Sequence, residues 1–80
     1  MSEYTEADLP VDIHHGEVVT LADGTPVRFE GNGEAKDVFL DDGFERTVEL
    51  FPTAEYTFDR GGKTFKLTAG FDDTMKVEVV

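Results

Sequence analysis

Apolar side chains recur at every second position through much of this chain, and that spacing constrains the fold more than any other feature. In the segment 63–69, Phe65, Leu67 and Ala69 alternate with polar residues. A period of two places apolar side chains on one face of a β-strand, whereas a helix needs them three and four positions apart. The same alternation occurs twice more, with apolar sets of Tyr56 and Phe58, and of Met75, Val77 and Val79. These segments are therefore predicted to be strands with one buried face.

A glycine pair between two of these segments predicts a hairpin and fixes its register. The pair at 61–62 suits a two-residue loop, because glycine adopts a positive φ at little steric cost. Such a loop places Phe58 opposite Phe65 and Tyr56 opposite Leu67. The apolar faces of the two strands then coincide, so the turn and the alternation predict the same register independently.

An Asp23-Gly24 pair predicts a second hairpin with a two-residue loop. This loop would place Val18 opposite Phe29 and Thr20 opposite Val27. Pro26 lies next to the turn and has no backbone N–H to donate. We therefore expect this ribbon at the edge of a sheet.

A three-residue turn is predicted at Asp41-Asp42-Gly43, with the glycine in the left-handed position. This turn would pair Leu40 with Phe44. In that register Lys36 shares a face with Val38.

Short strands separated by turns every 8 to 12 residues indicate an all-β fold, a small, mostly antiparallel sandwich or barrel of six to seven short strands. The 80 residues allow one domain, for which we expect residues 9–80, preceded by a flexible N-terminal segment at 1–8. Eight segments are candidates for these six to seven strands. They lie near residues 9–15, 17–21, 26–30, 34–40, 44–51, 55–60, 63–69 and 75–80. The chain has no cysteine, which excludes disulfides, Cys-ligated zinc and thiol catalysis.

The charge balance is strongly acidic and narrows the choice of partners. Eighteen Asp and Glu oppose seven Lys and Arg, which gives a net charge of −11. Nucleic acid and anionic membranes would be repelled by such a surface, so direct binding to either is not expected. No run approaches the ~18 apolar residues that a membrane span needs, and no leader pattern begins the chain. We expect a soluble cytoplasmic protein.

Residue patterns typical of metal and phosphate sites are incomplete. His14 and His15, in a stretch that also contains Glu17, point to opposite faces of a strand and could not both bind one ion unless the segment bends, and the chain has no third histidine. A calcium loop beginning at Asp41 would need a glutamate at its twelfth position, where Pro52 stands. The Gly31-Asn32-Gly33 stretch lacks the lysine and following helix of a phosphate loop. No metal and no cofactor are predicted.

Catalytic residues are equally scarce. The only serine is Ser2, and a chain of this length has little material from which to build a deep cleft. We therefore predict a protein that is not an enzyme.

The acidic surface is the remaining functional feature. Carboxylates held on rigid strands can imitate the spaced negative charge of a nucleic-acid backbone and occupy the basic groove of a nucleic-acid-binding protein. By size and charge, inhibitors of restriction or CRISPR systems are the type of protein that this indicates. The predicted contact residues are Glu45, Glu49, Glu55 and Asp59 on strands, with Asp41, Asp42, Asp72 and Asp73 in loops.

Two other readings of the sequence are open. A structural or accessory β module, or a domain adapted to a salt-rich cytoplasm, would carry the same acidic excess for solubility alone. A metal-dependent small-molecule binder built around His14, His15 and Glu17 is a third class.

Overall fold

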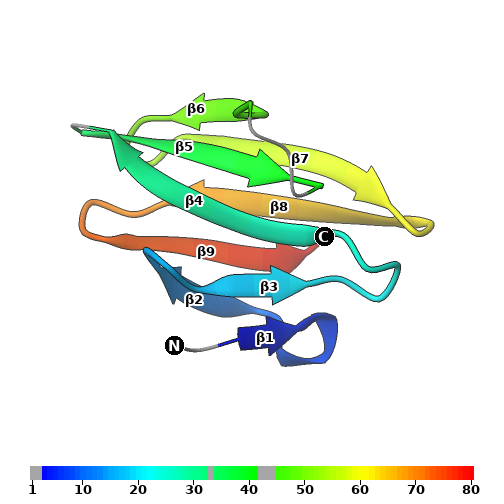
Figure 1. Cartoon of the computed structure of the whole chain (residues 1–80). Helices are drawn as coiled ribbons and strands as arrows, with labels where there is room; N and C mark the ends of the chain where they lie inside the picture. The colour runs from blue at the N-terminus through cyan, green and yellow to red at the C-terminus, as the bar shows by residue number, and fades with distance from the viewer. Residues whose placement is uncertain (1–2, 33, 42–44) are drawn as a thin grey trace.

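The computed structural model describes residues 3–32, 34–41 and 45–80, and it confirms an all-β fold (Figure 1). A five-stranded sheet has the order β1-β3-β4-β5-β6, and a four-stranded sheet has the order β2-β9-β8-β7. The first sheet contains β1 (Glu3–Thr5), β3 (Val18–Thr20), β4 (Pro26–Asn32), β5 (Ala35–Leu40) and β6 (Val48–Leu50). The second contains β2 (Val11–His14), β7 (Glu55–Arg60), β8 (Lys63–Ala69) and β9 (Thr74–Val79).

The predicted number of six to seven strands is wrong, because the described residues form nine. One of the additional strands lies near the N-terminus. Residues 3–8, which belong to the segment expected to be flexible, form β1 and a 3₁₀ turn, η1 (Glu6–Asp8). β1 is too short to show an alternation of its own, and it is ordered by parallel pairing with β3. All other strand pairs among the described residues are antiparallel, as expected.

The hairpin formed by β7 and β8 confirms the register predicted from the glycine pair. Phe58 lies opposite Phe65, and Tyr56 lies opposite Leu67. Both loop glycines have positive φ values, 60° for Gly61 and 80° for the residue that follows it. The rings of Phe58 and Phe65 stack with their centroids 5.6 Å apart. The loop chemistry and the side-chain pairing thus stabilise the same alignment.

The predicted register of the β3–β4 hairpin is wrong by one residue. Val19 lies opposite Val27, and the backbone N–H of Leu21 donates to Thr25 across a loop of three residues. Gly24, with φ of 92°, is the last residue of this loop. A single-residue slip exchanges the two faces of a strand, so Val19 is fully buried where Val18 was expected to point inward.

The predicted edge position of this ribbon is also wrong. β1 adds outside β3, and β4 is the central strand of the five-stranded sheet. Pro26 is tolerated there because it is the first residue of β4, where a missing N–H disturbs the hydrogen-bond ladder least.

The pairing of β5 with β6 differs from the predicted alignment by two residues. Val38 lies opposite Val48, and Lys36 lies opposite Leu50. The connection between β5 and β6 is therefore longer than the turn predicted at 41–43. Residues 42–44 lie outside the described residues. Asp41 itself has a φ of 64°.

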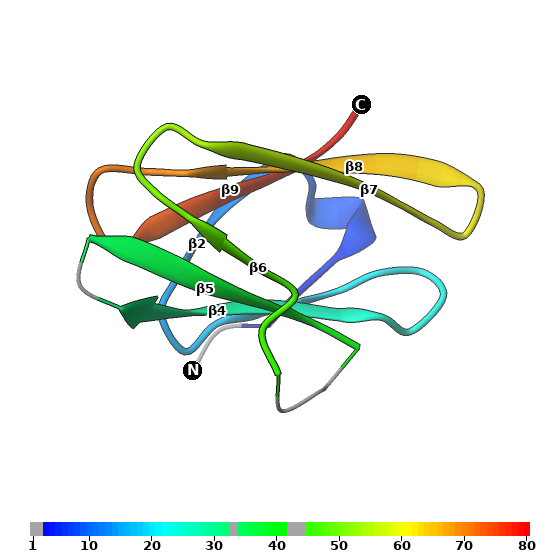
Figure 2. The same cartoon turned by 90° about the horizontal axis from the view of Figure 1, so that it is seen from above.

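The core lies between the two sheets, which face each other as two layers (Figure 2). Each sheet contributes a row of inward-facing apolar side chains. The five-stranded sheet supplies Val19, Val27, Phe29, Val38, Leu40 and Leu50, and the four-stranded sheet supplies Ile13, Phe58, Phe65, Leu67, Ala69, Met75 and Val77. Val79, predicted to continue the row of β9, is 47% exposed near the strand end.

Glu6 attaches the N-terminal segment to both layers. Its carboxylate accepts hydrogen bonds from the backbone N–H of Ala22, after β3, and from Nζ of Lys63, the first residue of β8. The hydrogen bond from Lys63, followed by that from Ala22, lowers the pKa of Glu6. The ionised form of Glu6 is thus the form that this contact favours.

We predict that Phe65→Ala lowers the free energy of unfolding by about 3 to 5 kcal/mol, because it removes a fully buried ring. Phe58→Ala, at the stacked partner, is expected to have a loss of the same order. Phe71→Ala is the matched control, since that ring is 84% exposed. Urea denaturation measures all three. A Phe65→Ala variant as stable as Phe71→Ala would contradict the assignment of the inner row.

A second prediction concerns pH. Because the pKa of Glu6 is lowered from an ordinary value of 4.5, its contact stabilises the fold above that pH and is lost as pH falls below it. The difference in unfolding free energy between wild type and Glu6→Gln should therefore be largest near neutrality and shrink below pH 4.5. Glu3→Gln, the same change at an exposed position of β1, is the matched control, and a trend of equal size in that variant would contradict the role of the Glu6 contact.

Candidate functional site

The four strand carboxylates predicted as the main contact surface are distributed over two sheets. Glu45 precedes β6 and Glu49 lies within it, whereas Glu55 and Asp59 belong to β7. β6 is an edge strand of the five-stranded sheet, and β7 is an edge strand of the other. Residues of the two strands are in contact, so these carboxylates follow neighbouring edges (Figure 2).

Three of these four carboxylates have partners within the protein. Nη1 of Arg46 lies 3.3 Å from a carboxylate oxygen of Glu49. Nζ of Lys66 lies 3.5 Å from Glu55, and a hydrogen bond to Glu78 together with the charge of Glu55 raises the pKa of this lysine. The hydroxyl of Thr64 donates to Asp59 over 2.7 Å. The two ion pairs reduce the charge that these edges offer to a partner, and the hydrogen bond from Thr64 occupies one oxygen of Asp59.

Two of the predicted loop aspartates are also engaged. Asp41 accepts a hydrogen bond of 2.8 Å from Nη2 of Arg60, which raises the pKa of the guanidinium. The hydroxyl of Thr74 donates to Asp72 and lowers its pKa, and the charge of Lys36 acts in the same direction.

The other two loop aspartates differ from these. Asp73 is exposed and has no hydrogen-bond or ion-pair partner among the described residues. Asp42 lies outside the described residues.

The cations of the chain are almost all paired with carboxylates. All seven lysines and arginines lie within the described residues, and six have a carboxylate oxygen within 4.0 Å. The exception is Lys36, which is 5% exposed and therefore buried. The described surface consequently carries unpaired carboxylates, such as those of Glu34 and Asp73, but no unpaired cation.

Lys36 is held by backbone carbonyl groups instead. Its Nζ donates to the carbonyl oxygen of Gly70 over 2.9 Å and to that of Asp72 over 2.7 Å. It lies 5.8 Å from the centre of the Phe29 ring. Because β5 and the β8–β9 loop belong to opposite sheets, the lysine ties the two layers together at one end of the core.

The position of Lys36 follows from the alternation of β5. Val38 and Leu40 point into the core, and a residue two positions before Val38 must point the same way. The alternation of side chains along β5 therefore predicts that this lysine points into the core. The carbonyl oxygens that accept its hydrogen bonds belong to a loop more than thirty residues away, and no local pattern indicates them.

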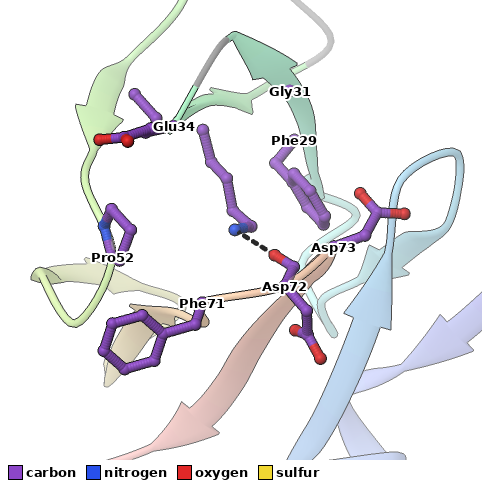
Figure 3. Close-up of a pocket in the computed structure, with 9 residues that line it drawn as sticks. Phe29, Gly31, Glu34, Pro52, Phe71, Asp72 and Asp73 are labelled. Atoms are coloured by element: carbon purple, nitrogen blue, oxygen red, sulfur yellow. Dashed lines mark hydrogen bonds between the residues drawn. The ribbon is translucent and has the colours of Figure 1, made fainter.

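A pocket of about 570 Å³ opens beside this lysine (Figure 3). It is larger than we expected for a chain of this length, and it is an open surface depression at the end of the two sheets. The residues that line it are Phe29, Gly31, Glu34, Ala35, Lys36, Pro52, Phe71, Asp72 and Asp73. Figure 3 shows Glu34 and Pro52 on one side and Phe29 and Asp73 on the other, with the ring of Phe71 directed outward.

Phe71 is the most exposed large apolar side chain of the described residues, at 84%. It directly precedes the two aspartates and follows Gly70, so the hydrogen bonds of Lys36 fix the loop on both sides of it. Sequence reasoning assigned Asp72 and Asp73 to a contact surface but missed Phe71, Glu34 and Lys36.

The residues of the incomplete metal pattern, His14, His15 and Glu17, have other contacts. The backbone N–H of His14 donates to Glu17, and the His14 ring lies 3.4 Å from the same carboxylate. The ring of His15 approaches Phe29 edge-on, with 6.4 Å between centroids. Across residues 3–32, 34–41 and 45–80, no three potential ligands among His, Asp and Glu converge on one point.

Within the same part of the chain, no helix is long and apolar enough to cross a bilayer. Comparison with protein-family models, curated proteins and solved structures gives no match.

We predict that Lys36→Met lowers the free energy of unfolding by about 1 to 3 kcal/mol, because the variant keeps an apolar stem but leaves the carbonyl groups of Gly70 and Asp72 without their donor. Lys76→Met is the control: its ammonium is exposed and lies 3.9 Å from Glu78, and such pairs contribute about 0 to 1 kcal/mol. Chemical denaturation measures both. Equal stability of Lys36→Met and wild type would show that the lysine does not hold the loop.

Proposed function

We propose that this chain is a non-enzymatic acidic module that binds a basic protein and blocks the surface with which that protein binds nucleic acid. The observation that carries the proposal is the distribution of charge. Among the described residues, six of the seven lysines and arginines lie within 4.0 Å of a carboxylate oxygen, and the seventh, Lys36, is buried. A basic groove would therefore meet carboxylates without meeting a free positive charge, as it does along a nucleic-acid backbone.

The centre of the contact surface is proposed to be the loop that contains Phe71. Interfaces are typically organised around a few apolar anchors that are surrounded by polar groups. Phe71 is exposed beside Asp73, and Glu34 lies across the pocket from that aspartate. We call Glu34, Phe71 and Asp73 the pocket rim. The carboxylates of the β6 and β7 edges are proposed to have a lesser role, since most of them already have partners.

An inhibitor of the anti-restriction or anti-CRISPR type is the specific form of this proposal. Such a role requires one-to-one binding and displacement of nucleic acid, and it requires no catalytic group. Fixed geometry favours it further, because charges held on a rigid loop lose little conformational freedom on binding. Lys36 provides that rigidity by anchoring the loop through two carbonyl groups.

The test is a competition experiment with a partner recovered from the source cell by pulldown. Labelled DNA or RNA is bound to the partner, and the protein is added at near-stoichiometric concentration in low and high salt. We expect displacement at low salt, weakened as salt screens the charges. If no recovered partner loses nucleic acid at low salt, the proposal is wrong and a structural or salt-adapted module is favoured.

Charge reversal locates the surface within the same assay. Glu34→Lys combined with Asp73→Lys should weaken displacement by about tenfold or more, because both changes fall at the centre of the proposed interface. Glu45→Lys combined with Glu55→Lys makes the same change in net charge at the strand edges and should have an effect of only about twofold to threefold. Equal losses from the two double variants would show that overall charge, and no particular site, controls binding.

A further inference from the structure

We infer that the pocket beside Lys36 accepts a single arginine side chain of the partner. This inference rests on the proposed function and identifies the chemical group that the pocket rim recognises. It depends on three properties of the pocket: its apolar walls, its carboxylates and the hydrogen bonds already made by its lysine.

The walls suit a long aliphatic stem. Pro52 lies on one side of the opening, and Phe71 stands at its edge with most of its ring in solvent (Figure 3). Phe29 lines the inner end of the pocket and is itself 1% exposed. Long basic side chains bury their methylene groups against such surfaces and keep the charged end at the exterior. The exposed face of Phe71 offers a guanidinium a place to stack.

The charges at the opening favour a cation. Three acidic residues and one basic residue line the pocket. The carboxylate of Asp72 is already bonded to Thr74, which leaves Glu34 and Asp73 to receive a ligand. Both are exposed, and Figure 3 places them on opposite sides. A carboxylate receives a planar guanidinium through two parallel hydrogen bonds, an arrangement that a lysine ammonium cannot reproduce.

The buried lysine does not make the pocket an anion site. Two of the three donors on its Nζ are already used by carbonyl oxygens, and the amine is held against the β8–β9 loop. A ligand carboxylate or phosphate would have to pass the carboxylates of the pocket rim to reach the remaining donor. Lys36 therefore offers a ligand anion at most one free hydrogen-bond donor, and that donor lies behind the carboxylates of Glu34 and Asp73.

The pocket volume of about 570 Å³ lies within the roughly 300 to 1,000 Å³ typical of ligand sites. One arginine side chain would occupy only part of it. The remaining opening leaves room for the residues on either side of that arginine in the partner.

The inference is tested by NMR titration of the ¹⁵N-labelled protein with small probes. N-acetyl-arginine methylamide should shift the backbone amides of residues 34–36 and 70–73, with a dissociation constant on the order of 1 to 10 mM for so small a ligand. The lysine analogue should bind about threefold more weakly, since it can neither stack nor form the paired hydrogen bonds. The citrulline analogue has nearly the same shape without the charge and should cause no localised shifts.

Variants separate the pocket from general attraction to an acidic protein. Phe71→Ala and Glu34→Gln should each weaken arginine binding by about threefold to tenfold. Phe51→Ala and Glu45→Gln are the matched controls, because Phe51 is 57% exposed, Glu45 is also exposed, and neither lines the pocket. Equal binding of citrulline, shifts spread over the whole surface, or the same shifts with inorganic phosphate would each overturn the inference.

The outcomes also distinguish this inference from the proposed function. If the protein displaces nucleic acid from its partner but Phe71→Ala and Glu34→Gln leave that displacement unchanged, the arginine pocket is wrong and the broader proposal stands. If arginine binds at the predicted amides but no partner loses nucleic acid, the pocket is correct and the inhibitory role is wrong.

Discussion

Burial of the two inward-facing apolar rows against each other is the interaction on which the rest of this structure depends. Among the described residues no helix covers the inner face of either sheet, and the chain has no cysteine from which to form a disulfide. Each sheet can therefore remove its apolar row from water only by packing on the other. The stacked rings of Phe58 and Phe65 lie within this contact, and the end of the core is closed by Lys36, whose amine reaches the opposite layer.

Local patterns predicted those parts of the fold in which neighbouring signals agree. Between Tyr56 and Leu67, the alternation and the glycine loop require the same register. At the β3–β4 hairpin, by contrast, Asp23-Gly24 fits both a two-residue loop and the last two positions of a three-residue loop. The structure has the three-residue loop, and this loop places Val19 in the core. The pairing of β1 with β3 joins segments that share no turn, so no local pattern could predict it.

The candidate site was predictable only in part, for a related reason. Acidic loop residues are visible in a sequence, and Asp72 and Asp73 were identified from it. Whether a carboxylate remains available depends on cations brought near by the fold, as for Asp41 and Arg60, which are nineteen positions apart. The pocket likewise combines residues from β4, β5 and three loops.

The hydrogen bonds of Lys36 to backbone carbonyl groups differ in kind from the ion pairs of the described surface. The geometry of the site and its attraction for a charged partner therefore depend on different interactions. Carbonyl oxygens do not take up protons in the ordinary pH range, and a buried ammonium is little affected by dissolved ions. The loop that carries Phe71 thus holds its geometry across wide changes in salinity. The attraction exerted by Glu34 and Asp73, which face solvent, weakens as the salt concentration rises. In a concentrated salt solution the pocket would keep its geometry while its affinity for a charged partner falls. The salt concentration would then control how much of the site is occupied without changing its structure.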